Sequence, residues 1–178
     1  MIFNFSWLPK LIIFDNKESF EKYYDKIYDI FKRDFVETRP FFQSKPVGLQ
    51  IEPKVNGKIQ TFHHITTEDI KDKKGNIIRK IAIDRCERIA WNKAIIESNY
   101  FGLKIFPEKR SHNRKNIVIW FEEKDFVIIL REAKNYYVFI TAYPIKYKHK
   151  KEKLQKSYTK HLKAETAQNK ADSTLFLH

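Results

Sequence analysis

Apolar positions are most regularly arranged between residues 116 and 145, where three runs of β-branched and aromatic residues follow one another. Short charged segments, such as residues 122–125, separate the runs, and this arrangement is typical of consecutive antiparallel strands. The first run, residues 117–121, is apolar at every position, so both of its faces should be covered at the centre of a sheet. Residues 116–145 are therefore predicted to form a three-stranded meander.

Helical spacing of apolar residues marks two other stretches. Residues 16–35 carry aromatic and isoleucine side chains three to four positions apart, and Asn16 can cap the first turn. Residues 148–163 carry three apolar side chains spaced four apart among many lysines. Both stretches are predicted to be helices, and the polar residues 164–178 are expected to form a frayed helix or a polar C-terminal tail.

The segment between the first helix and the meander is less regular. Asn56 and Gly57 lie between two β-prone runs within residues 47–65, and this dipeptide favours the tight turn of a β-hairpin. Residues 67–80 are charged and are expected to form a mobile loop. Residues 81–100 fit either a short strand that leads into a helix or an irregular turn.

The order of elements is therefore helix, hairpin, mixed segment, meander and helix. This order predicts an α+β fold with one curved antiparallel sheet and a basic C-terminal helix. A chain of 178 residues is long enough for one domain with a substantial core. We expect residues 1–163 to form that domain.

The net charge of +13 indicates the kind of partner to expect, because so much like charge favours the binding of polyanions. Nucleic acid is the first candidate and an anionic membrane surface the second, while a lysine-rich genome-wide composition is the alternative without functional meaning. The apolar residues 1–14 are interrupted by Pro9 and Lys10 and are too short to span a bilayer, so no membrane association is expected. The single cysteine, Cys86, excludes a disulfide framework and fits a reducing, cytoplasmic compartment.

The last strand of the predicted meander ends in hydroxyl groups. Strict alternation places Phe139, Thr141 and Tyr143 on one face of that strand. Thr141 can donate a hydrogen bond to a phosphate oxygen, and Tyr143 can also stack on a base. Threonine and tyrosine are equally common as ordinary strand residues, so the pattern alone does not decide between the two roles.

His63 and His64 are adjacent on the second strand of the predicted hairpin, so their side chains should face opposite ways. Histidine titrates near neutral pH and is the usual general acid or base. We favour His64 for this role, because His63 shares a face with Ile59 and Ile65, which should point to the core. A packed, purely structural histidine remains the alternative for both.

Arginines and lysines supply candidate phosphate contacts in three places. Arg85 and Arg88 lie in a dense charged cluster, where they could bind phosphate or form internal ion pairs with Asp84 and Glu87. A basic loop is expected at residues 107–115. Together with the C-terminal helix, this loop could neutralise a nucleic-acid backbone without reading its sequence. The candidate nucleic-acid contacts are Lys109, Arg110, Arg114, Lys115, Lys146, Lys148, Lys150 and Lys151.

A rival site contains carboxylates. Asp84 follows a short apolar run, and Glu122 and Lys124 follow the first strand of the meander. An acidic residue combined with Glu-x-Lys at a strand end is the pattern by which metal-dependent nucleases of the PD-(D/E)xK type hold magnesium. Residues 122–125 would make an equally good charged turn.

Three segments resemble the barnase/EndoU/colicin/RelE-like (BECR) ribonuclease superfamily, especially its phage- and mobile-element-associated branch. They are YYVFITAYPI at residues 136–145, HHIT at 63–66 and RCERIAW at 85–91. The resemblance implies a small α+β domain that cleaves RNA without a metal or other cofactor. In that reaction the ribose 2′-hydroxyl attacks the neighbouring phosphate and leaves a 2′,3′-cyclic phosphate.

The resemblance also implies roles for individual residues. His64 or His63 would be the general acid/base, Arg85 or Arg88 would stabilise the phosphate, and the hydroxyls of Thr141 and Tyr143 would position it. Lys146 and His149 are the candidates for protonating the leaving 5′-oxygen.

Three hypotheses follow. The first is a metal-independent endoribonuclease, and a toxin-like role would pair it with an acidic antitoxin or immunity protein. The second is a nucleic-acid-binding module without catalysis. The third is the metal-dependent nuclease.

Overall fold

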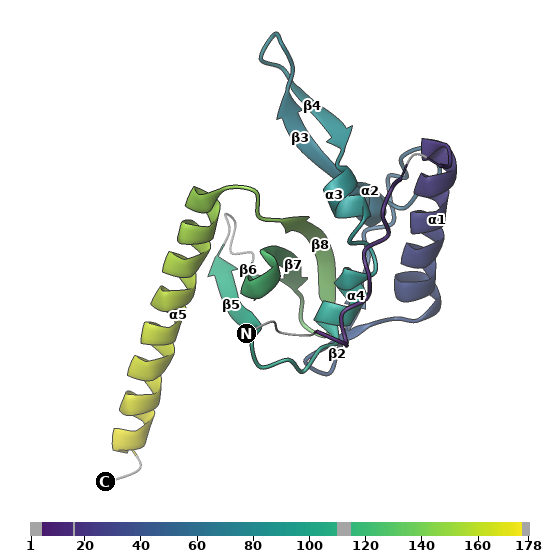
Figure 1. The fold of residues 1–178 in the computed structure, drawn as a ribbon. Helices are drawn as coiled ribbons and strands as arrows, with labels where there is room; N and C mark the ends of the chain where they lie inside the picture. The colour runs from purple at the N-terminus through teal and green to yellow at the C-terminus, as the bar shows by residue number, and fades with distance from the viewer. Residues whose placement is uncertain (1–4, 16, 110–114, 176–178) are drawn as a thin grey trace.

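The structure, a computed structural model, describes residues 5–15, 17–109 and 115–175 (Figure 1). Its sheet has six strands in the order β1-β2-β8-β7-β6-β5. All neighbours are antiparallel except β2 and β8, which are parallel. The strands are β1 (Phe41–Phe42), β2 (Lys45–Gly48), β5 (Lys104–Lys109), β6 (Lys115–Phe121), β7 (Phe126–Glu132) and β8 (Tyr137–Pro144).

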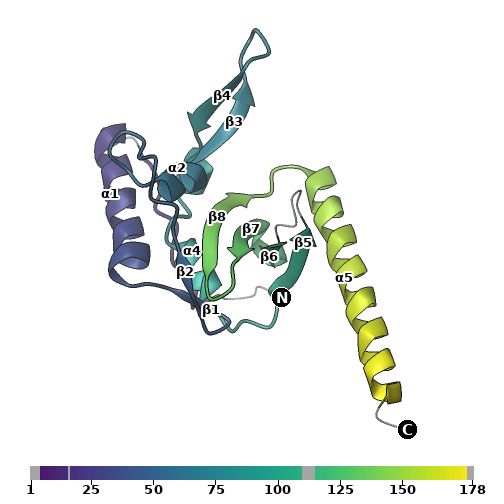
Figure 2. The ribbon, with the colours of Figure 1, turned by 180° about the vertical axis from the view of Figure 1, so that it is seen from behind.

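Helices lie on both sides of this curled sheet, and a separate hairpin projects from it (Figures 1 and 2). The α+β class, the N-terminal helix and the C-terminal helix are confirmed. The helices are α1 (Phe20–Lys32), α2 (Gln60–Thr66), α3 (Ile83–Cys86), α4 (Trp91–Ile96) and α5 (Lys148–Leu175). A π-helical turn, η1 (Arg33–Glu37), extends α1, and a 3₁₀ turn, η2 (Glu122–Lys124), connects β6 to β7. The separate hairpin consists of β3 (Thr67–Lys71) and β4 (Ile77–Ile81).

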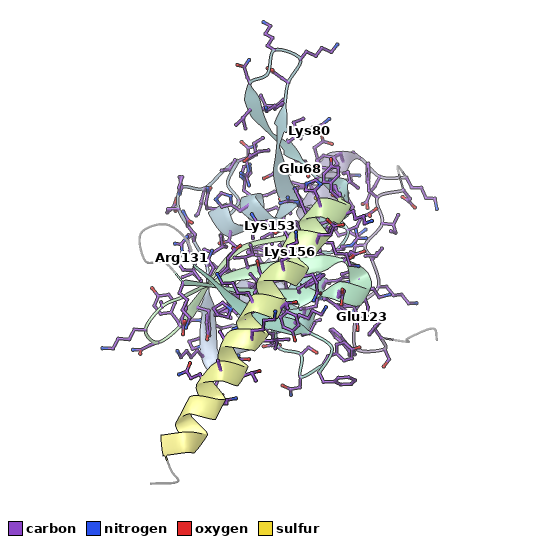
Figure 3. All side chains as sticks on the ribbon, turned by 90° about the vertical axis from the view of Figure 1, so that its left-hand side faces the viewer. Glu68, Lys80, Glu123, Arg131, Lys153 and Lys156 are labelled. Carbon is purple, nitrogen blue, oxygen red and sulfur yellow. The ribbon has the colours of Figure 1, made fainter. Side chains whose placement is uncertain are left out.

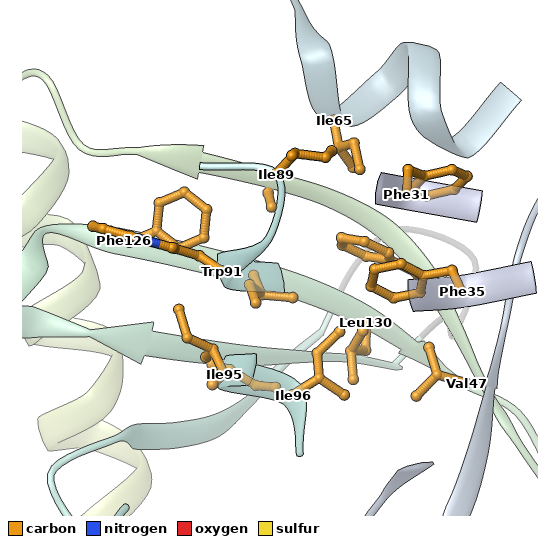
Figure 4. Close-up of a cluster of buried hydrophobic side chains, with 14 of the residues drawn as sticks. Phe31, Phe35, Val47, Ile65, Ile89, Trp91, Ile95, Ile96, Phe126 and Leu130 are labelled. Carbon is orange, nitrogen blue, oxygen red and sulfur yellow. The ribbon is translucent and has the colours of Figure 1, made fainter. Parts of the chain in front are cut away.

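The meander formed by β6, β7 and β8 is confirmed, and β6 is buried on both faces as its apolar run predicts. Side chains on one face pack with α1, α2 and α4 in the larger core, part of which is shown in Figure 4. Those on the other face, including Trp120 and Ile129, pack with Leu154 and Tyr158 of α5 in a smaller core. We call these the α1 face and the α5 face of the sheet.

The N-terminal helix forms because one of its faces can be completely buried. Tyr23, Ile27 and Phe31 recur every four residues and have no exposed surface. The Ser19 hydroxyl accepts a hydrogen bond from the Lys22 amide and caps the helix. Asn16, the predicted cap, lies outside the described residues.

The predicted hairpin around Asn56 and Gly57 is wrong beyond its turn. Both residues have the positive φ angles of the expected turn, but the pairing is limited to one bridge between Val55 and Lys58. The run that should have been the second strand is instead helix α2. Helical spacing lets Phe62 and Ile65 enter the same core, whereas a strand would turn them to opposite faces.

The predicted mobile loop at residues 67–80 is also wrong, because it forms the five-pair hairpin of β3 and β4. The Asp72 carboxylate accepts hydrogen bonds from the amides of Lys74 and Asn76 across the turn, and Gly75 supplies the positive φ angle there. Residues 81–100 resolve into the end of β4 followed by the short helices α3 and α4.

Two further boundaries differ from the prediction. Strand β5 includes the first residues of the expected basic loop, Pro107 to Lys109, because their backbone pairs with β6. Helix α5 continues beyond the predicted end at residue 163 to Leu175, so most of residues 164–178 are helical, which was one of the two alternatives for them. Within the part of the chain that the structure describes, no helix is both long and apolar enough to cross a membrane.

Candidate functional site

Helices α2 and α3 and strands β3, β4 and β7 meet the second half of β8 and line a pocket of about 390 Å³. Strand β2 pairs with only the first part of β8, at Tyr137 and Val138. Beyond that point helix α2 lies along the open edge of β8, with the Thr61 hydroxyl 3.5 Å from the Phe139 carbonyl oxygen. The pocket is lined by Gln50, His64, Thr67, Glu68, Asp69, Arg79, Arg85, Arg131, Ile140, Thr141 and Tyr143.

A β-bulge in β8 decides which side chains reach this pocket. Leu130 pairs with Phe139, but its neighbour Ile129 pairs with Thr141, so Ile140 is the extra residue. Phe139 therefore points to the α1 face, while Thr141 and Tyr143 point to the α5 face. The prediction that these three share a face is wrong, because strict alternation does not hold across a bulge.

Helix α2 brings His64 to the pocket. In the structure Arg79 Nη2 lies 3.0 Å from His64 Nδ1. A guanidinium only donates hydrogen bonds, so Nδ1 must accept, and the neutral ring carries its proton on Nε2. The Gln60 side chain lies with its Nε2 atom 3.0 Å from His64 Nε2, and two N–H groups cannot hydrogen-bond to each other. Turning this amide over brings its buried Oε1 atom, which has no partner among the described residues, to the position that accepts the His64 Nε2 proton.

The surroundings of His64 favour its neutral form. Partial burial, the charge of Arg79 and the neighbouring His63 lower the pKa of His64 below its ordinary 6.5, although the carboxylate of Asp69 acts in the opposite direction. The imidazole is therefore uncharged at pH 7. In that state it can accept a proton, which is what a general base requires.

His63 does not line the pocket, although burial and Arg79 also lower its pKa. Both histidines were predicted on a strand, which would turn them to opposite faces. On helix α2 their rings are 6.3 Å apart between centroids. The structure thus separates the two candidates that the sequence left open.

Arg85 of α3 contacts residues of three other elements that line the pocket. Its Nη1 atom donates to the carbonyl oxygen of Thr67 at 2.6 Å and to that of His64 at 3.4 Å. The His64 carbonyl oxygen also lies 3.5 Å from the Thr141 hydroxyl. The guanidinium of Arg85 lies 5.5 Å from the ring of Tyr143, which is close enough for a cation–π contact. Burial lowers the pKa of Arg85, but an arginine remains a cation at any working pH.

Two arginines that line the pocket were missed in the sequence. Arg79 of β4 donates to the Thr67 hydroxyl at 2.7 Å and pairs with Asp69 at 3.1 Å, in addition to its contact with His64. Arg131 of β7 reaches the pocket from the α5 face. The signal for Arg79 was the pair of β-prone runs on either side of the Lys-Lys-Gly-Asn turn at residues 73–76, which is a hairpin pattern.

The other predicted arginine, Arg88, is not part of the pocket lining. Its Nη1 atom donates to the Asp84 carbonyl oxygen at 2.7 Å, and its guanidinium lies 5.1 Å from the Trp91 ring. Lys146, just beyond β8, instead binds the carboxylates of Glu68 at 2.9 Å and Asp84 at 3.1 Å. Partial burial alone would lower the pKa of Lys146, but these two carboxylates outweigh it and raise that pKa.

Most of the predicted nucleic-acid contacts whose side chains the structure describes form ion pairs within the molecule. Arg110 and Arg114 lie outside the described residues, as does the side chain of Lys109. Three of the others form ion pairs: Lys115 with Glu132 at 2.8 Å, Lys148 with Glu152 at 4.0 Å and Lys151 with Asp125 at 2.7 Å.

Lys150 lies at a second pocket, of about 280 Å³, between α5 and the sheet. Arg85 and Tyr143 line both pockets, so the two adjoin at these side chains; we refer to the two pockets together as the groove. Lys153 lines the α5 side of the second pocket, and Figure 3 shows it together with Lys156 on the part of α5 that lies in front of the sheet. Opposite charge is present as well, because Glu108 of β5 also lines this part of the groove.

The carboxylates of the rival metal site are engaged elsewhere. Asp84 pairs with Lys146, and Glu122 pairs with Lys104 at 2.5 Å. Among the residues that the structure describes, no three histidine, cysteine, aspartate or glutamate side chains are grouped closely enough to hold a metal ion. These residues do not fit the metal-binding set that the Glu-x-Lys pattern suggested.

Searches of protein-family models, curated proteins and solved structures found no match to this chain. We therefore infer its function from the geometry and charge of the groove.

Proposed function

We propose that the protein binds single-stranded RNA in this groove and cleaves it without a metal ion. The observation that carries the proposal is the convergence of His64, Arg85, Thr141 and Tyr143 on one pocket. They come from α2, α3 and the end of β8, which are far apart in the sequence. A neutral imidazole, a guanidinium and two hydroxyls are a set of groups that can bind a phosphate and move a proton beside it.

The pocket has the charge that a phosphodiester requires. Its guanidinium groups, from Arg79, Arg85 and Arg131, outnumber the carboxylates of Glu68 and Asp69. Arginine presents a planar fork of donors that matches phosphate oxygens. The ring of Tyr143 lies at the junction of the two pockets, where it can stack on a base next to the bound phosphate.

The proposed reaction proceeds as follows. Arg79 turns from His64 to the phosphate, which frees Nδ1 to accept the proton of the ribose 2′-hydroxyl. The 2′-oxygen forms a bond to phosphorus and the bond from phosphorus to the 5′-oxygen breaks, which leaves a 2′,3′-cyclic phosphate. Arg85 and the Thr141 hydroxyl stabilise the charge that develops on the phosphate oxygens. The departing 5′-oxygen takes a proton from solvent water, because all the side chains that line the pocket except Thr67 are partly or fully exposed.

Neither residue first considered as the proton donor suits that role. The two carboxylates that hold Lys146 raise its pKa, so this ammonium gives up its proton reluctantly at neutral pH. The His149 ring stacks against Tyr147, with centroids 5.5 Å apart, and does not line either pocket of the groove.

One observation favours a second function, the binding of RNA without cleavage. Both ring nitrogens of His64 are engaged, by Arg79 and by Gln60. If Arg79 keeps its place when RNA binds, no lone pair is available to accept a proton. The same groove would then hold a phosphate but leave it intact.

Incubation of the purified protein with single-stranded RNA, with and without EDTA, separates these functions. Cleavage that survives the chelator and yields 2′,3′-cyclic phosphate ends supports the proposal. A matched 2′-O-methyl RNA, which has no 2′-hydroxyl to attack, should bind but remain intact. Binding without cleavage of either RNA would favour the second function, and cleavage that EDTA abolishes would refute the metal-independent reaction.

A further inference from the structure

Helix α5 carries a row of lysines that begins at the second pocket and extends beyond the groove. Lys153, Lys156, Lys160 and Lys163 follow one another at intervals of three and four residues, which places them on one face of the helix. We call this row the lysine stripe. All four side chains are exposed.

The charges of the stripe are not neutralised within the molecule. Among the described residues, none of its four lysines forms an ion pair, in contrast to Lys148 and Lys151 of the same helix. The two glutamates of α5 with described side chains have other partners: Glu152 pairs with Lys148, and Glu165 lies 3.3 Å from His161. Four unpaired cations on one helix face repel one another, and an anionic strand laid along them would relieve that repulsion.

The stripe begins at the groove. Lys153 lines the second pocket, which shares Arg85 and Tyr143 with the first. From there the helix runs past the edge of the sheet, and its far half lies apart from the rest of the fold (Figures 1 and 2). An RNA strand that leaves the first pocket beside Tyr143 therefore passes directly onto the lysine stripe.

We propose that the lysine stripe is an extended binding site for the RNA backbone, which carries the strand away from the pocket along α5. This inference rests on the proposed function and defines the substrate further, as a single strand with several nucleotides on one side of the bound phosphate. From Lys153 to Lys163 the helix rises about 15 Å, which matches roughly four nucleotides of a stacked strand at about 3.4 Å each. The contacts are to phosphates, so the site selects length and charge and not base sequence.

The salt dependence of RNA binding reports how many phosphates the lysine stripe neutralises. Each phosphate neutralised on a single strand adds about 0.7 to the slope of log affinity against log salt, so four lysines add about 2.8. Between about 50 and 200 mM salt, a strand that covers the stripe should therefore lose about 50-fold more affinity than one confined to the pocket.

The test uses 2′-O-methyl RNA oligonucleotides, which cannot be cleaved, in a fluorescence anisotropy titration. For the native protein, extending an oligonucleotide from about four to about eight nucleotides should tighten binding and add about 2.8 to the salt slope. A variant with Lys156, Lys160 and Lys163 changed to Gln keeps Lys153, which lines the groove. It should bind the short strand normally and gain only about 0.7 in salt slope from the extension. Glutamine has nearly the helix propensity of lysine, so the helix should persist, as circular dichroism can check.

A control variant removes the same charge elsewhere, with Lys22, Lys54 and Lys134 changed to Gln; these three are exposed and outside the groove lining. It should keep the gain from extension. If the native protein binds the short strand but extension changes neither affinity nor slope, or if both variants lose the gain equally, the stripe proposal is overturned and the proposed function stands.

Failure of the native protein to bind any of these strands, even at about 50 mM salt, would overturn the proposed function together with the stripe. A parallel titration with vesicles of equal parts phosphatidylserine and phosphatidylcholine tests the alternative polyanionic partner, an anionic membrane surface. Stripe-dependent binding to vesicles without a length-dependent gain on RNA would assign the stripe to a membrane surface and overturn the RNA proposal.

Discussion

The adjacent histidines of α2 provide a sharp test, because one lines the pocket and its neighbour does not. Changing His64 to Ala removes the proposed base together with its contacts to Gln60 and Arg79. At about 1 kcal/mol for each hydrogen bond, the fold should lose about 1–2 kcal/mol, or about 2–8 °C in melting temperature for a chain of this length. Loss of general base catalysis should lower the cleavage rate by about 10²–10⁴-fold, or about 3–5 kcal/mol in barrier height.

The matched control is the change of His63 to Ala, which removes from the same helix another half-buried imidazole whose pKa is also lowered. Its cleavage rate should stay within about twofold of the native rate. The assay is single-turnover cleavage of labelled RNA in EDTA, at a temperature well below both melting transitions. Equal losses in the two variants, or an unchanged rate when His64 is replaced, would refute the assignment of the base.

The remaining predictions concern charge and packing around the same groove. Neutral His64 is the active form and its pKa is lowered, so the cleavage rate should rise with pH to a plateau, with the inflection of the profile below the ordinary 6.5. Changing Arg79 to Met removes a positive charge that lowers this pKa, so the inflection of the pH–rate profile should move to higher pH; a downward shift would contradict the electrostatic argument. Changing Lys146 to Met leaves its two carboxylate partners uncompensated beside the pocket, and RNA affinity should fall about two- to fivefold in anisotropy titrations, whereas tighter binding would speak against this reading. Phe62 is fully buried against the aromatic rings of α1, so its change to Ala should cost about 3–5 kcal/mol and lower the melting temperature by about 6–20 °C; a shift of only a degree or two would show that the core closes around the cavity.

Local patterns were enough to predict the meander and both long helices. In β6 and β7 successive apolar side chains enter the two cores in turn, so a continuous apolar run was a faithful sign of a strand covered on both faces. In α1 the repeat of Tyr23, Ile27 and Phe31 has the helical period and nothing competes with it. These elements could be predicted because their own sequence specifies both their conformation and the face they bury.

Helix α2 was wrongly predicted as a strand from its local sequence pattern. Its sequence contains residues favoured in strands and follows a genuine turn at Asn56 and Gly57. Helical geometry prevails because it directs Phe62 and Ile65 into the core beside α1, which depends on residues far away in the chain. The histidines that follow are therefore positioned by that packing and not by their own neighbours.

Taken alone, the sequence determined the fold class, the excess of positive charge and the residue types available for phosphate chemistry, because composition and periodicity are properties of the chain itself. Only the tertiary structure decided which of them meet. The bulge at Ile140 turns Thr141 and Tyr143 away from Phe139, and the position of α2 on the open edge of β8 selects His64 over His63. Both depend on contacts between distant segments, which no local period encodes.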